Sequence, residues 1–474
     1  MNRINNDSLS WRRDLLGIAL AGLLSLLPFL GQTDDLVSRE VRHAQIAREM
    51  ATHGHFLVPT LLGETYIDKP PVMHTLIALL YRLAGEHNML LARLPSVLAA
   101  VGGALALYGI ALTLYGRKTA LIAGFGVLTL IGYTHMARAA RPDMIYTFAI
   151  LLACLGFTCT LRRAAWQAWP GLLLAGVAAG IATICKGPLG LLFPLMFVPA
   201  AIWRNPLLRR PAVMECVIFV AVFVVSLGMW LVPAWLQDGG DYVHRVLSQP
   251  DLDPDSSGSG HPFWWYLPQL LAGLVPMVFL LPWVVKDLRQ QGVSGMLVLV
   301  LLMLLLLSCV SKKRIHYLLP VFPFLVMVIA DAVVRFEKVQ AAKIFVGVTL
   351  LCWPLYFAYQ QSRSQQYEDW QFSVAREVAQ KAGKQDPILC NGVVGEYVAF
   401  MAADDQVSRW ADEAELRAAL AKSGGSAWVI FSADTAEILQ HITGVDVQAS
   451  ELLLHQKDAK KNSNPYYMRR VQLQ

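Results

Sequence analysis

Charged side chains that could do chemistry stand beside long apolar runs at widely separated places in the chain. Lys186 lies between two apolar runs, so its ammonium group must find an anion, a carbonyl or water in a nearly dry setting. Asp143 begins another apolar run, and Lys312, Lys313 and Arg314 form a cationic triplet before a third. Preorganised cations stabilise developing negative charge, and a carboxylate can take up a proton. The alternative is that each charge only anchors the end of a span among lipid headgroups.

A second group of polar residues follows the first apolar run. Residues 39–50 combine charged side chains with an approximate apolar stripe, which predicts a helix that lies on a membrane and carries Glu40 and Arg42. Asp68 and Lys69 come shortly afterwards and precede a pair of prolines that restrict the backbone. We expect these residues to face the same site as Lys186, because the predicted topology places all of them on one side of the membrane.

Composition indicates which elements carry these residues. Of the 474 residues, 55% are hydrophobic and 16% are charged, and the mean hydropathy is +0.46. A single water-soluble domain does not need so much apolar surface for its core, so the bilayer is the expected solvent. Eleven stretches have roughly the length of a membrane-spanning helix: 15–33, 94–116, 119–137, 144–161, 164–185, 187–203, 216–237, 262–285, 290–311, 315–334 and 344–362.

Two other features of the apolar pattern complete the predicted fold. No small-residue cleavage site follows 15–33, so we interpret it as an uncleaved span and not as a signal peptide. The run 70–81 is too short to span and predicts a helix at the membrane interface. The predicted fold is therefore mainly α, a polytopic membrane protein with about 11–13 transmembrane helices.

Basic residues near the span ends predict the orientation. With the N-terminus in the cytoplasm, that side receives fifteen such residues and the short outer loops receive seven. We therefore expect a transmembrane domain over 1–362, a first outer loop with juxtamembrane helices over 34–93, and a C-terminal domain over 366–474 outside the cytoplasm. Helix-like and strand-like runs in the last segment predict a small α/β domain.

Several motifs occur together in an order that is similar to a known family. The first outer loop contains E-x-R-x-A-x-I-A-R-E-M and P-x-L-x-G-x-x-Y-x-D-K-P-P, and A-R-L-P-S follows them. In these motifs the chain resembles the bacterial polyprenyl-phosphate-sugar glycosyltransferases of the C-type membrane fold, which include aminoarabinose transferases that modify lipid A and are related to protein O-mannosyltransferases. Further matching segments are Arg141 to Asp143, Cys185 to Pro188, Gly260 to Pro268 and Ser311 to Pro320.

The resemblance implies a reaction and a location. A sugar would pass from a polyprenyl (undecaprenyl) phosphate to a lipid A or lipopolysaccharide-type acceptor, or to a protein, on the periplasmic face of the bacterial inner membrane. It also implies site roles. Glu40 and Asp143 would be catalytic, Lys69, Lys186, Lys312 and Lys313 would bind the donor phosphate, and Arg42, Tyr66, Asp68, His261 and Tyr317 would bind substrate.

One departure from the family concerns the first loop. Many relatives carry an Asp-Glu pair there, whereas this chain has Arg39 followed by Glu40. The acidic role then passes to Glu40 or Asp143, or to Asp34 or Asp35, which come slightly early in the chain. The remaining alternative is a degenerate member that binds its ligand without turning it over.

The same residues are compatible with other ligands and functions. Asp68 and His261 could hold a divalent cation, but two ligands make a weak signal and a hydrogen-bonded pair explains them as well. The default mechanism is therefore metal-independent. The sequence has no basic-aromatic pattern for nucleic acid, so the expected partners are membrane lipids and the two substrates. A polytopic lipid flippase or transporter is the alternative function, although charges are nearly absent from the middles of the spans.

Overall fold

The computed structural model describes most of the chain and divides it into two compact units. The helical unit comprises 1–30, 67–76 and 93–359, and the mixed unit comprises 31–66, 77–92 and 360–474. The described residues are 2–31, 40–164, 167–203, 205, 208–248, 261–310, 313–364, 370–382, 387–391, 394–402, 407–424, 426–432, 435, 451–452 and 466–472.

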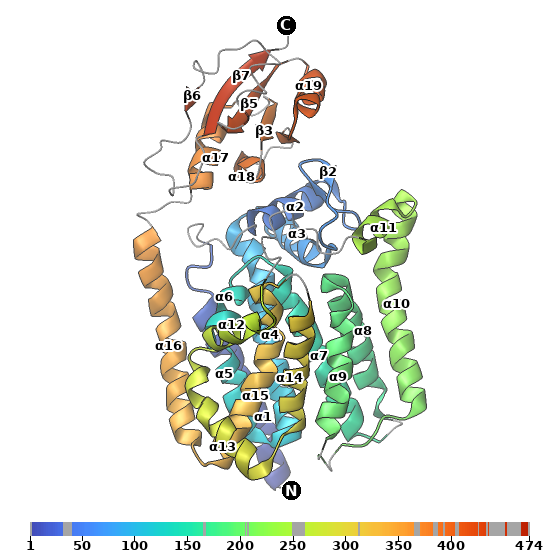
Figure 1. Cartoon of the computed structure of the whole chain (residues 1–474), viewed down its shortest axis with the longest axis vertical. Helices are drawn as coiled ribbons and strands as arrows, with labels where there is room; N and C mark the ends of the chain where they lie inside the picture. The colour runs from blue at the N-terminus through green and yellow to red at the C-terminus, as the bar shows by residue number, and fades with distance from the viewer. Residues whose placement is uncertain are drawn as a thin grey trace. The chain divides into compact units, whose positions relative to one another are not determined.

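Long helices that run beside one another make up the helical unit (Figure 1). Short 3-10 helices, η2 (Phe263–Trp265), η3 (Met277–Leu280) and η4 (Ile315–Leu318), precede α12, α13 and α15. The α-helices are α1 (Asn2–Leu26), α4 (Met89–Tyr115), α5 (Arg117–Val127), α6 (Ile131–Ala137), α7 (Pro142–Arg162), α8 (Trp169–Lys186), α9 (Leu189–Ile202), α10 (Val213–Asp238), α11 (Asp241–Ser248), α12 (Tyr266–Gly273), α13 (Leu281–Gln291), α14 (Gly295–Cys309), α15 (Val321–Arg335) and α16 (Val339–Ser364).

Each of the eleven predicted spans corresponds to a helix or to a bent pair of helices. Among the described residues, five helices are long and apolar enough to cross a membrane, and counting each bent pair as one span raises the number to seven. The bends lie between α5 and α6, at 61°, and between α12 and α13, at 99°. Apolar helices of fewer than eighteen residues, such as α9 and α14, account for other predicted spans. The mainly helical, multi-pass membrane fold is confirmed.

Small residues allow the central helices α7 and α8 to pack backbone against backbone. A Cβ on Gly156 would lie 2.5 Å from the carbonyl oxygen of Gly171 and 2.7 Å from the amide nitrogen of Ala175. Glycine is therefore required at 156, as is common where membrane helices pack closely. The outer face of α10 is different, because large side chains such as Val217, Val224 and Leu236 are exposed along it. Such a face suits contact with lipid chains.

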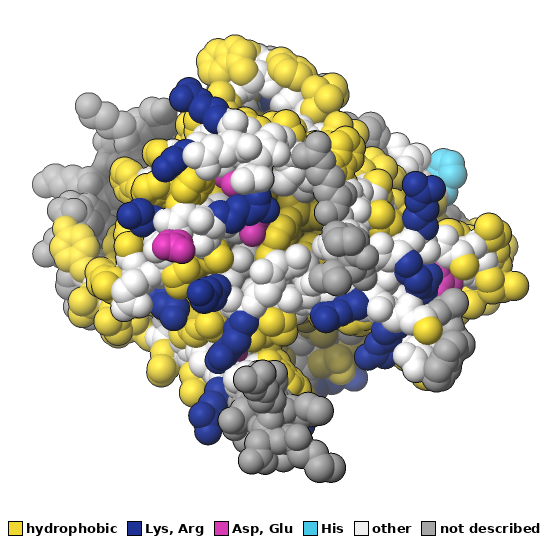
Figure 2. All heavy atoms as spheres, turned by 90° about the horizontal axis from the view of Figure 1, so that it is seen from below, with side chains coloured by type: hydrophobic (Ala, Val, Ile, Leu, Met, Phe, Trp, Pro, Cys, Tyr) yellow, Lys and Arg dark blue, Asp and Glu magenta, His cyan; other side chains and the backbone are white. Residues whose placement is uncertain are grey.

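Basic side chains gather at the end of the helical unit that carries the N-terminus (Figure 2). At this end Arg117 makes two hydrogen bonds, of 2.6 and 2.7 Å, to the buried carboxylate of Asp14, which also accepts a bond from Tyr108. The concentration of Lys and Arg on this face agrees with the predicted orientation, in which it faces the cytoplasm.

The mixed unit contains the first loop and a small sheet. The loop forms α2 (Glu40–His53), the hairpin of β1 (Thr60–Leu61) and β2 (Glu64–Thr65), and most of α3 (Val72–Ala84). The helices predicted over 39–50 and 70–81 are therefore present as α2 and α3. After them the tail adds α17 (Trp370–Lys381), β3 (Ile388–Asn391), α18 (Val394–Ala402), β4 (Val407–Trp410), α19 (Glu413–Lys422), β5 (Ser426–Ser432), β6 (Glu451–Leu452) and β7 (Tyr466–Gln472).

The tail sheet has the strand order β4-β3-β5-β7-β6. Strand β3 is parallel to β4 and β5, whereas β7 is antiparallel to β5 and β6. Trp410, Leu416, Leu420 and Phe431 form part of its buried core. The predicted small α/β domain is confirmed. Its predicted boundary at 366 stays a prediction, since the contacts group the tail with parts of the first loop.

Candidate active site

Two helix ends position the central residues of the site. Pro142 occupies the first turn of α7 after the extended backbone of Arg141, which places Asp143 in the same turn. Lys186 is the last residue of α8, and Gly187 ends that helix with a φ of +82°, a conformation that glycine adopts without strain. The antiparallel packing of α7 and α8 therefore brings Asp143 and Lys186 together.

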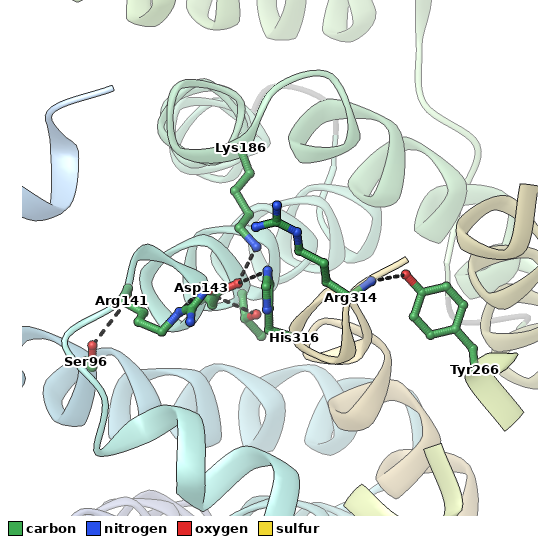
Figure 3. A network of polar contacts seen from close by, with 8 residues as sticks. Ser96, Arg141, Asp143, Lys186, Tyr266, Arg314 and His316 are labelled. Atoms are coloured by element: carbon green, nitrogen blue, oxygen red, sulfur yellow. Dashed lines mark hydrogen bonds and ion pairs between the residues drawn. The ribbon is translucent and has the colours of Figure 1, made fainter. Parts of the chain in front are cut away.

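Asp143 is the centre of a polar network (Figure 3). The Nζ atom of Lys186 donates a hydrogen bond to Oδ1 of Asp143. The Nε2 atom of His316, in η4, lies 3.9 Å from the same oxygen, and Nε of Arg141 lies 3.4 Å from Oδ2. The side chains of Asp143 and Lys186 are 2% and 11% exposed. A buried carboxylate is thus ion-paired in the way that burial demands.

Arg314 adds a further cation to this network. Its backbone N–H donates to the hydroxyl of Tyr266 at 3.2 Å, and its side chain points toward Lys186 (Figure 3). With Arg141, Lys186 and Arg314 around a single carboxylate, positive charge exceeds negative charge among the residues of this network. Such a surplus at a partly buried place favours an anionic ligand.

Two other predicted residues lie beside Lys186. Its ammonium lies 4.8 Å from the ring centroid of Tyr317 and 5.8 Å from that of Tyr146, within the range of cation–π attraction. Lys69 is near enough to interact electrostatically with Lys186. The structure therefore brings together four of the predicted residues, Asp143, Lys69, Lys186 and Tyr317.

The remaining predicted residues of the helical unit have other surroundings. Lys313 is buried, and its ammonium donates to the carbonyl of Val310 at 3.0 Å, so it caps the end of α14. The ring of His261 stacks on Trp265, with centroids 4.4 Å apart. Asp68 is exposed. Lys312 lies outside the described residues, as do Asp34, Asp35 and Arg39.

Three predicted residues belong to the mixed unit. Glu40 begins α2 and is buried, and Tyr66 is buried after β2. The guanidinium of Arg42, which we expected to bind substrate, is paired with the carboxylate of Glu396 in α18.

Metal binding gains no support from the geometry. No group of three His, Cys, Asp or Glu side chains that could hold a metal ion occurs within the part of the chain that the structure describes.

The prediction did not assign His316, Arg314 or Arg141 to the site. Arg314 directly follows Lys313, and Arg141 stands two positions before Asp143, each within a segment that matches the family. His316 lies one position before Tyr317, so the sequence offered a signal for it that was not used. A lone histidine at the start of an apolar run usually has a structural role, and only its distance to Asp143 indicates otherwise.

Comparisons with known proteins find similarity to the kind of glycosyltransferase that the motifs indicate. The model of the dolichyl-phosphate-mannose-protein mannosyltransferases matches residues 68–230, and that of the Alg9-like mannosyltransferase family matches 256–387. An undecaprenyl phosphate-alpha-4-amino-4-deoxy-L-arabinose arabinosyl transferase of Shewanella sediminis is 28% identical over 70% of this chain and 61% of its own length. The corresponding protein of Pectobacterium carotovorum is 31% identical over 66% and 57%. The chain thus spans less than two thirds of the length of these relatives.

Solved structures extend the likeness to nearly the whole chain. The crystal structure of ArnT from Cupriavidus metallidurans in the apo state has a TM-score of 0.73 at 15% identity and covers 98% of both chains. The same protein bound to undecaprenyl phosphate has a TM-score of 0.69 at 16% identity and covers 97% of this chain and 98% of that one. The resemblance to the family is confirmed: the chain is similar in sequence to aminoarabinose transferases, and it has the C-type membrane glycosyltransferase fold that the ArnT structures show.

Proposed function

We propose that this protein is a glycosyltransferase that moves a sugar from a polyprenyl phosphate, such as undecaprenyl phosphate, to an acceptor. The observation that carries the proposal is the network around Asp143, in which a buried carboxylate holds Lys186 while Arg141 and Arg314 add positive charge. The names of the relatives in Shewanella and Pectobacterium, which include an undecaprenyl phosphate-linked sugar, support the same reaction class.

In the proposed reaction the bond between the sugar carbon and the phosphate oxygen breaks, and a bond from that carbon to an acceptor oxygen forms. The electron pair of the broken bond stays on the departing polyprenyl phosphate. Lys186 and Arg314 stabilise that charge, because fixed cations act strongly where water is largely excluded. Asp143 keeps the ammonium of Lys186 oriented through their hydrogen bond.

The acceptor decides whether a general base is needed. An acceptor hydroxyl would lose its proton to a carboxylate, for which Glu40 and Asp143 are the candidates. A phosphate acceptor, as on lipid A, has no such proton to lose, and the carboxylates would then orient the sugar. We propose a lipid A or lipopolysaccharide-type acceptor, with a protein as the alternative, and a site on the periplasmic face of the inner membrane.

A transfer assay on the purified protein in lipid nanodiscs tests the proposal. Undecaprenyl phosphate carrying radiolabelled aminoarabinose is supplied with lipid A, and the label should move to the acceptor. Lys186→Ala should weaken binding of undecaprenyl phosphate about ten- to hundredfold, since a hydrogen-bonded charge contact contributes about 1.5–3 kcal/mol. Arg162→Ala, an exposed residue at the other end of α7, is the matched control and should leave binding unchanged.

Two results would overturn the proposal. Equal effects of the two substitutions would mean that Lys186 only anchors its helix. In proteoliposomes, passage of the intact donor lipid from one leaflet to the other, with its sugar bond unbroken and no label on the acceptor, would assign the protein to the lipid flippases instead.

A further inference from the structure

Helix α18 of the tail contacts the first loop at three places within the mixed unit. It meets α2 through Glu396, the hairpin of β1 and β2 through Gly395, and the segment before α4 through Phe400. These contact points are more than 300 positions away from their partners in sequence. The tail is therefore joined to the loop that carries Glu40.

The contact with α2 is a buried ion pair. The Nε atom of Arg42 donates to Oε1 of Glu396 at 2.9 Å, and a terminal guanidinium nitrogen lies 2.7 Å from the same oxygen. The two side chains are only 13% and 3% exposed. Loss of one partner of a buried ion pair is strongly destabilising, so the pair favours one arrangement of the two helices.

The other two contacts hold α18 against the rest of the loop. A Cβ added to Gly395 would lie 3.4 Å from Cδ1 of Leu62, so the first turn of α18 lies close to the hairpin. The hairpin is itself tied to α2, because the amide of Leu62 donates to Glu49 at 2.7 Å. In the last turn of α18, the carbonyl oxygen of Phe400 lies 3.3 Å from Nε2 of His87.

The position of Glu40 depends on the same helix. Glu40 lies two residues before Arg42, and ten of the fourteen residues of α2, charged ones included, are buried. A helix enclosed to this extent moves as a rigid body, because close-packed side chains transmit displacement instead of absorbing it. Whatever sets the rotation of Arg42 about the helix axis therefore sets that of Glu40 as well.

We propose that α18 fixes the orientation of α2, and that Glu396 is a positioning residue that acts on Glu40 through Arg42. The tail then acts on the proposed reaction through α2. The kinetic consequence rests on the function proposed above, whereas the contact itself does not.

Hydrogen exchange on the full-length protein in nanodiscs tests the contact without reference to activity. Glu396→Gln should speed exchange of the α2 amides by at least roughly tenfold while the β5 amides in the tail core stay protected. The double variant Arg42→Glu with Glu396→Arg, which restores an ion pair in reverse, should return the α2 amides toward the wild-type rate. Glu413→Gln is the matched control, since its pair with Arg417 lies on the surface of the same tail.

Sugar transfer by the same variants tests the positioning role. Glu396→Gln should lower kcat at least about tenfold with a smaller change in KM for the donor, and the reversed pair should recover part of kcat. Unchanged α2 exchange in Glu396→Gln would overturn the contact. Faster exchange with an unchanged kcat would overturn the positioning role. A wild-type protein without transfer activity would contradict the proposed function, and the exchange result would still decide the contact.

Discussion

The ammonium of Lys186 donates a hydrogen bond to the carboxylate of Asp143, although the two residues are 43 positions apart and belong to different helices. Both side chains are largely buried, and they lie at helix ends that glycine and proline define. The pair thus combines a fixed cation with the carboxylate that orients it. It is the element around which the other charges of the proposed site are arranged.

Removal of the Asp143 charge should abolish transfer without unfolding the protein. Asp143→Asn leaves Lys186 without its compensating charge and without a fixed direction, so we expect the rate of transfer to fall at least about a hundredfold. The rate is measured with labelled donor, and size-exclusion chromatography in detergent checks the fold.

Asp14→Asn is the control for that substitution. Asp14 is also a buried carboxylate with an arginine partner, but its partner is Arg117 in a different part of the helical unit. The variant should lower the midpoint temperature of unfolding and keep the transfer rate per folded molecule. An equal loss of transfer in both variants would show that Asp143 acts through stability alone.

Arg314 and Lys313 should differ in their effect on the donor lipid, although they are neighbours in the sequence. The Arg314 side chain points toward Lys186, whereas the ammonium of Lys313 is bonded to the carbonyl of Val310. Arg314→Ala should therefore raise the Kd for undecaprenyl phosphate roughly ten- to hundredfold. Lys313→Ala should change it less than about threefold. The reverse order would return the phosphate role to Lys313.

The contact between the tail and the first loop should weaken in mild acid. Burial lowers the pKa of His87 below its ordinary 6.5, and Arg48 lowers it further, whereas the bond to Phe400 and the charge of Glu86 oppose the shift. Because the pKa is lower in the folded state, His87 binds fewer protons there than in the unfolded state. The contribution of neutral His87 to the stability of the folded protein is therefore complete above pH 6.5 and is lost as the pH falls below it.

Thermal unfolding measured across that pH range checks the effect. The midpoint temperature should fall between about pH 6.5 and 5, and it should fall less steeply in His87→Gln, whose amide does not titrate. Equal slopes in the two proteins would remove His87 as a source of the pH dependence.

Reporter fusions test the proposed orientation. Fusions after 117, 163 and 287 should report a cytoplasmic position, and fusions near 64 and 400 should report the opposite side, because basic residues are concentrated at the first set of loop ends. A cytoplasmic signal at 400 would contradict the scheme and separate the tail from the periplasm.

The sequence predicted those site residues whose surroundings require a partner of opposite charge. Lys186 stood between two apolar runs, and the structure gives it the anion that such a position requires. The sequence could not decide whether Lys313 or Arg314 faces the proposed phosphate site, because the direction of these two side chains depends on the backbone that leads into η4. Lys312 is not among the described residues, so its role stays a prediction.

The sequence predicted the long helices better than the short strands and the long-range contacts of the tail. Apolar runs located the helices well, since a bilayer-length hydrophobic segment has few alternatives. Strands β3 and β4 were not predicted, because four residues such as Ile388–Asn391 are too few to show a period. The ion pair of Arg42 and Glu396 could not be predicted from the sequence either. Its partners are 354 positions apart, and either charge alone looks like an ordinary surface residue.

The antiparallel arrangement of α7 and α8 has an electrostatic consequence. Asp143 lies in the first turn of α7, where the helix dipole presents its positive end, and Lys186 lies in the last turn of α8, where the dipole of that helix is negative. Each charge is therefore stabilised by its own helix as well as by the other. The backbone itself supports the ionised pair, so an arriving anionic lipid would meet charges that are already in place.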